Sequence, residues 1–195
     1  MTDSPRDVGD ATRVGPASPD GQASPPSPRT RLGSYAVVLD NEDRILLCRL
    51  SADEVEAGAW TLPGGGVEFG EHPDETVIRE LEEEAGLTGR IDDVVGIFSK
   101  VYQRSRAAGG ADLHFIGFLY RVAPVGGALR DEVEGSTDTC AWFRPDELRA
   151  LRIVGVARHA IRLVLPDAVI PEPEYRGPAH AEAARPAPDA LEPAG

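Results

Sequence analysis

The segment 65–87 of this 195-residue chain, GGVEFGEHPDETVIRELEEEAGL, constrains its fold and chemistry more than any other. A glycine-rich loop runs directly into a stretch in which acidic residues recur at helical spacing. The residues at fixed intervals are Gly65, Glu71, Arg79, Glu80, Leu81, Glu83, Glu84, Gly86 and Leu87. A loop and helix of this kind, with exposed backbone groups and several carboxylates, can hold divalent cations against a phosphate chain.

The acidic stretch is expected to be a helix over Pro73–Ala85. Proline suits the first helical position, and Gly86 suits the left-handed residue that ends a helix. At about 100° per residue, Glu80, Glu83 and Glu84 fall within one arc, beside the apolar stripe that is expected to be buried.

An acidic run on a helix is ordinarily a solvated face. Here the arrangement opposes helix stability, because like charges three or four residues apart cost about 0.2–0.5 kcal/mol per pair. Glu83 and Glu84 also fall in the last turn, where the helix dipole disfavours anions. A bound divalent cation removes both penalties, and such ions prefer oxygen ligands. The pattern therefore favours a metal site over a solvated face.

At every defining position the segment resembles the signature of the Nudix hydrolases, G-x5-E-x7-R-E-U-x-E-E-x-G-U, in which U is a bulky aliphatic residue. The resemblance implies hydrolysis of a nucleoside diphosphate linked to another moiety, X, with Mg²⁺ or Mn²⁺ as cofactor. It implies Glu80 and Glu84 as metal ligands, with Glu83 as a ligand or its neighbour and the Gly65 carbonyl as a further ligand. Glu83 and Glu84 are also the catalytic candidates on the helix.

The resemblance gives three signature residues supporting roles. Arg79 is expected to orient a glutamate through an ion pair, Glu71 to brace the loop, and Gly86 to end the helix. The general base often comes from outside the signature in this family. Glu134, in D-E-V-E-G-S, is the candidate distal acid, with a solvated loop acid as the equally open alternative, and Glu68 is a second candidate.

The candidate substrate-binding residues, Tyr102 and Arg104, lie in the hairpin expected downstream of the signature. Arginine pairs with phosphate through two hydrogen bonds, and tyrosine stacks on a base. Ordinary loop residues are an equally open interpretation. Family members that open dinucleoside polyphosphates often carry a tyrosine in this region, so Tyr102 leans towards that group.

Composition divides the chain into a folded unit and two tails. Residues 1–31 and 171–195 are rich in Pro and polar or small residues and are expected to be disordered, which leaves 32–170 as the folded unit. The expected strands are 34–40, 44–50, 60–62, 94–102, 113–122 and 140–143, and the expected helices are 73–85, 145–151 and 154–165. This order predicts an α+β fold with a mixed β-sheet covered by helices, and the resemblance implies the Nudix α/β/α sandwich.

Net charge and cysteine content limit the classes of binding partner and the cellular location that we expect. A net charge of −13 argues against stable nucleic-acid binding and against an anionic membrane surface. Cys48 and Cys140 lie in apolar runs and are expected to be buried small hydrophobes without a disulfide framework. No apolar stretch is long enough to span a bilayer, and a cytoplasmic location is expected. The expected partner is a small nucleotide or diphosphate substrate, and a homodimer is left open.

Two other functions are weighed against hydrolysis. A non-catalytic Nudix-type nucleotide sensor tends to lose signature acids, and here all are present. An isoprenoid diphosphate isomerase of the same fold needs a cysteine in a polar site, whereas both cysteines lie in apolar runs.

Overall fold

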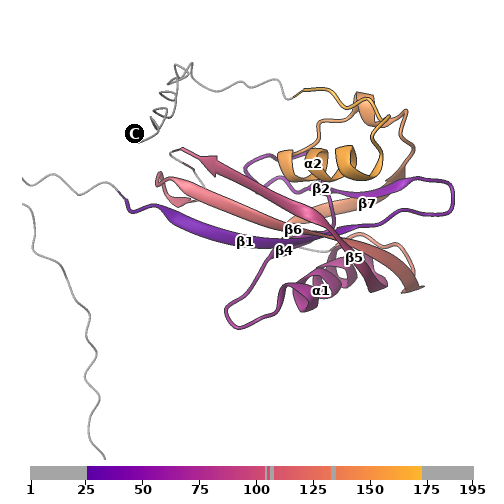
Figure 1. Cartoon of the computed structure of the whole chain (residues 1–195), viewed down its shortest axis with the longest axis horizontal. Helices are drawn as coiled ribbons and strands as arrows, with labels where there is room; N and C mark the ends of the chain where they lie inside the picture. Colours follow the sequence, from indigo (N-terminus) through magenta and orange to yellow (C-terminus); the bar gives the residue numbers. More distant parts are fainter. Residues whose placement is uncertain (1–25, 104, 106–107, 133–134, 173–195) are drawn as a thin grey trace, which may run out of the picture.

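The structure is a computed structural model that describes residues 26–103, 105, 108–132 and 135–172. Its two helices lie on opposite sides of a central β layer, α2 above and α1 below in Figure 1, which confirms the expected α/β/α sandwich. The elements are β1 (Arg29–Val37), β2 (Ile45–Leu50), β3 (Trp60–Thr61), β4 (Gly64–Gly66), α1 (Pro73–Ala85), β5 (Leu87–Tyr102), β6 (Leu113–Gly127), β7 (Thr137–Phe143), a 3-10 turn η2 (Leu148–Ala150) and α2 (Gly155–Val164).

The β layer consists of two sheets. One has the strand order β4-β1-β6-β5, and the other has the order β3-β2-β7. β1 and β6 run parallel, from Arg29 opposite Leu113 to Val37 opposite Arg121, and the other paired strands are antiparallel. β1 and β2 are consecutive, but they enter different sheets and are joined near their turn by a Leu39–Ile45 bridge.

Several elements differ in length from the sequence expectation. β1 begins at Arg29, ahead of the expected start of the folded unit at residue 32, because its first residues pair with β6. β5 begins at Leu87 instead of residue 94, because three register shifts fit its polar first half against β6. The helix expected over 145–151 is the short turn η2. The remaining parts of the two tails lie outside the described residues.

Each helix closes one half of the core. α1 buries Val77, Leu81 and Ala85 in a cluster with residues of β1, β2 and β6. α2 buries Ala157, Ala160 and Ile161 in the second cluster, on the other side of the β layer. Within the described segments, neither helix is long and apolar enough to cross a membrane.

The expectation that the two cysteines form no disulfide is wrong. Both are buried as predicted, but a disulfide joins Cys48 of β2 to Cys140 of β7. The antiparallel register of these strands places the two residues directly opposite each other, although 92 positions separate them in sequence. Spacing along the chain does not reveal this pairing, because the register is set by the surrounding strands.

Candidate active site

The glycine loop is fixed as a short strand at the edge of the four-stranded sheet. β4 pairs antiparallel with β1, with Gly64 opposite Tyr35. Gly64 has φ 145°, and a Cβ there would lie 2.3 Å from the carbonyl oxygen of Ser34. Only glycine fits this close approach, which turns the following loop towards α1.

α1 begins and ends where the sequence predicts, and local contacts fix its start. His72 is the N-cap and forms a capping box with Glu75, followed by Pro73 at the first position. The Ser34 hydroxyl donates a 2.7 Å hydrogen bond to the Pro73 carbonyl and so ties the helix to β1. Gly86 ends the helix in the left-handed conformation with φ 69°.

Glu84 is the most buried acid of the site, with 1% of its surface exposed. Its carboxylate accepts hydrogen bonds from the Gly64 N–H at 2.9 Å and the Ser136 hydroxyl at 3.0 Å. Burial raises the pKa of Glu84 to about 8, and the nearby charge of Glu80 adds to the rise, while the two hydrogen bonds oppose it. Through these two hydrogen bonds, Glu84 connects the edge of one sheet to the start of the other. Its carboxyl group is a weaker acid than an ordinary glutamate.

Arg79 connects the other acids of the signature. Its guanidinium donates to both Glu71 oxygens at 2.9 and 3.1 Å, to Glu80 at 3.0 Å and to Glu83 at 2.9 Å. The bonds from Arg79 lower the pKa of Glu71 to about 2. Glu71 also accepts the Glu68 N–H at 3.1 Å, which links the loop to the helix.

Glu80 packs directly against the backbone of the glycine loop. A Cβ on Gly65 would lie 2.4 Å from the Glu80 carboxylate, so the absence of a side chain at Gly65 makes room for it. Burial raises the pKa of Glu80, and Arg79 opposes this rise. The carboxylate, the buried Glu84 nearby and the loop carbonyls are all oxygen donors of the type that Mg²⁺ and Mn²⁺ prefer, so the residues present fit such an ion.

The predicted metal ligands are not gathered as one preformed group. Among the residues that the structure describes, no three His, Cys, Asp or Glu side chains are arranged to hold a metal ion. Glu83 is half exposed, and its carboxylate accepts a 2.9 Å hydrogen bond from Arg79. In this form the guanidinium of Arg79 neutralises part of the acidic group.

The predicted residues outside the signature have different outcomes. Glu134 and Arg104 lie outside the described residues. Tyr102 is half-buried at the end of β5, where it packs in the core beside α2 and where Lys100 Nζ lies 5.0 Å from its ring centroid. Burial raises the pKa of the Tyr102 hydroxyl.

Two charged residues near the site were not singled out from the sequence. The charge of Glu132 raises the pKa of both Glu80 and Glu84, so this carboxylate lies close to them, held by the N–H and hydroxyl of Thr137. Its signal in the sequence is its place in D-E-V-E, two residues before the predicted acid Glu134. Arg31 of β1 lies beside the loop, where a Cβ on Gly66 would be 3.2 Å from its guanidinium.

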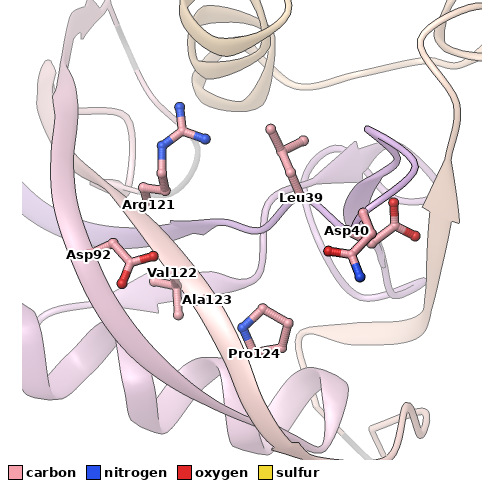
Figure 2. Close-up of a pocket in the computed structure, with 8 residues that line it drawn as sticks. Leu39, Asp40, Asp92, Arg121, Val122, Ala123 and Pro124 are labelled. Carbon is pink, nitrogen blue, oxygen red and sulfur yellow. The ribbon is translucent and has the colours of Figure 1, made fainter.

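Two cavities open on the surface. One of about 470 Å³ adjoins the signature loop and is lined by Thr30, Arg31, Leu32, Gly66, Val67, Glu68, Phe69, Gly70 and Glu71. The other, of about 350 Å³, has Arg121 and Asp92 on one side and Leu39 and Asp40 on the other (Figure 2). None of the residues that line the second cavity belongs to the signature segment, whereas residues 66–71 of that segment line the first.

Comparison with known proteins places the chain in a family. Residues 29–164 match the model of the NUDIX domain. A MutT-like protein of Streptomyces ambofaciens is 32% identical over 138 residues, which cover 71% of this chain and 78% of that protein. The nucleoside triphosphatase NudI of Salmonella arizonae is 29% identical over 128 residues, which cover 65% of this chain and 91% of that protein.

Solved structures agree in fold. A MutT NUDIX hydrolase from Burkholderia pseudomallei has a TM-score of 0.56 and 27% identity, and the match covers 69% of this chain and 98% of that protein. The family match spans both sheets, both helices and every signature residue. The chain belongs to the Nudix hydrolase family.

Proposed function

We propose that this Nudix hydrolase cleaves a diphosphate bond in a nucleoside diphosphate linked to another group, with Mg²⁺ or Mn²⁺ as cofactor. The observation that carries the proposal is the Glu80 carboxylate packed against Gly65, beside the buried Glu84. The relative from Salmonella arizonae is named a nucleoside triphosphatase, and a nucleoside triphosphate is one member of this substrate class.

The proposed metal ligands are the Gly65 carbonyl and the carboxylates of Glu80, Glu84 and Glu83. Glu83 is the most exposed of these side chains and is held in part by Arg79, so it is the ligand with the most freedom to rotate. When bound, the divalent ion would neutralise the diphosphate and lower the pKa of the attacking water. Arg79 and Glu71 keep the loop and the helix in register for the ligands.

The chain itself supplies candidate proton acceptors. On the helix, Glu83 and Glu84 are the candidate bases, through a carboxylate oxygen that the ion leaves free. The acidic loop before β7 is the second source. Glu132 is the described acid of this loop whose charge reaches both helix acids, and Glu134 remains a proposal from the sequence.

Substrate anions are proposed to meet Arg31 at the wall of the cavity beside the loop. Its guanidinium lies over Gly66, one residue beyond the proposed carbonyl ligand, and can pair with phosphate oxygens. Tyr102 and Arg104 remain proposed contacts to the base or to the remote phosphates.

A chromatographic screen for the nucleotide product of hydrolysis tests the function. Nucleoside triphosphates, ADP-ribose, nucleotide sugars and dinucleoside polyphosphates are each assayed with Mg²⁺, Mn²⁺ or EDTA. We expect turnover of at least one class that requires the metal, and a loss on the order of 10²–10⁴-fold in Glu84→Gln. Glu82→Gln, an exposed acid of the same helix, is the matched control and should retain activity. If the protein binds a nucleotide but hydrolyses none of the substrates with either metal, it is instead a nucleotide sensor.

A further inference from the structure

We propose that two copies of this chain associate through the outer edge of β5, with residues Gly96–Tyr102 of one copy paired antiparallel to the same residues of the second. The proposal concerns assembly and does not depend on the hydrolytic function. It follows from the position of β5 in the sheet, from the residues exposed along it and from its self-complementary register.

β5 is the outermost strand of the four-stranded sheet. It pairs with β6 on one side, and among the described residues no strand pairs with its other side. Figure 1 shows β6 lying between β5 and β1, with the β5 arrow ending at the upper left. Alternate N–H and C=O groups along such an edge point outward and can pair with another strand.

The two halves of this edge differ. The first half is interrupted by register shifts at Thr88/Gly89, Ile91/Asp93 and Val94/Gly96. It also carries Arg90, Asp92 and Asp93, and bulges and charges are devices that prevent strand-to-strand association. The second half, Gly96–Tyr102, pairs regularly with β6 and contains a single charged residue, Lys100.

Apolar side chains are exposed along this edge. Val94, Ile97 and Val101 of β5 are 53%, 56% and 58% exposed. Ile97 and Val101 lie on one face of the strand, whereas Gly96 is on the other face, which is covered by Leu163 of α2. Exposed apolar side chains grouped on one face of an edge strand are typical of an interaction surface.

The regular segment is complementary to itself. Its midpoint is Ser99, and a two-fold axis there places Ile97 opposite Val101 of the second copy. Apolar cross-strand pairs each contribute about 0.2–1 kcal/mol, so the two Ile97–Val101 pairs favour the register about Ser99.

The charges of the segment bear on the register. Two molecules that each carry a net charge of −13 repel each other, and Gly96–Tyr102 adds no acid to that repulsion. About Ser99, Lys100 lies opposite Phe98 of the second copy, whereas an axis at Lys100 would oppose two lysines and cost stability. β4, with the candidate active site, is at the other edge of the sheet, so the pairing leaves that site open.

Light scattering after size exclusion tests the association on the full chain. The wild type is expected to approach twice the chain mass of 20.8 kDa as concentration rises. Ile97→Lys should lose the dimer, whereas Val169→Lys, which changes an apolar side chain that is 70% exposed elsewhere, should keep it. Melting curves confirm that both variants are folded. A wild type that remains monomeric, or a dimer that survives Ile97→Lys, would overturn the proposal.

Cysteine cross-linking tests the register. Directly opposed residues in antiparallel strands have Cα atoms about 4.5–5.5 Å apart, which a disulfide can bridge. Ser99→Cys should therefore form a covalent dimer under mild oxidation, and no native thiol competes. Ile97→Cys should not, because residue 97 faces residue 101 of the second copy. Cross-linking of Ile97→Cys but not of Ser99→Cys would contradict pairing about Ser99.

Discussion

Glu84 links stability to pH through its burial. Its pKa rises from the ordinary value of 4.5 to about 8, so the folded state holds a proton that the unfolded state releases. The resulting stabilisation is complete below about pH 4.5 and is lost as the pH rises through 8. In EDTA we expect the melting temperature to fall over this range, and to fall less in Glu84→Gln. Thermal melts of both proteins at each pH check this, and equal slopes would contradict it.

Arg79 is the resident counter-charge of the acidic group, because its guanidinium contacts Glu71, Glu80 and Glu83. Arg79→Gln leaves these acids without a cation and should lower the melting temperature in EDTA. Mg²⁺ should then raise the melting temperature more in this variant than in the wild type, since more repulsion remains for the ion to relieve. Arg90→Gln, an exposed arginine paired with Asp92, is the control. If Mg²⁺ raises the melting temperature equally in all three proteins, Arg79 is not the counter-charge of the acidic group.

At the scale of elements, the junction of β4 and α1 depends on the absence of a side chain at Gly65. Gly65→Ala places a Cβ 2.4 Å from a Glu80 oxygen, so the carboxylate must move. A displacement of about 1 Å costs on the order of 100-fold in turnover, and we expect at least that loss. Gly126→Ala adds its Cβ at an ordinary 3.9 Å from Thr88 and should be nearly neutral. Wild-type turnover in Gly65→Ala would show that Glu80 needs no contact with the loop.

The same elements show which features are readable from the sequence. The bounds of α1 were predicted correctly, because Pro73 and Gly86 are local signals that act within one turn. The clustering of Glu80 and Glu84 near Gly65 follows from helical spacing and a short loop. The proximity of Glu132 and the Cys48–Cys140 pair could not be predicted, since both depend on how β7 lies against β2 and α1.

At the scale of the whole molecule, the candidate site lies where the two sheets meet. Glu84 accepts one hydrogen bond from Gly64 of the four-stranded sheet and one from Ser136, which precedes β7 of the other sheet. Cys140 Sγ lies 3.3 Å from the Glu84 carbonyl oxygen. The disulfide-linked strands β2 and β7 therefore pack against the last turn of α1. The stability of the second sheet is thereby coupled to the position of the central acid.

The disulfide should therefore contribute to global stability. A cross-link between residues 92 positions apart restricts the unfolded chain by about 4–5 kcal/mol in the loop-entropy model, which corresponds to about 8–20 °C in melting temperature. Thermal melts with and without a phosphine reductant measure this difference, with the double variant Cys48→Ala, Cys140→Ala as a control that should not respond to the reductant. Thiol titration in denaturant should find no free thiol before reduction and two after it, the full cysteine content of the chain. Two free thiols in the untreated protein, or identical melts in the two conditions, would show that strand packing alone holds β2 and β7 together.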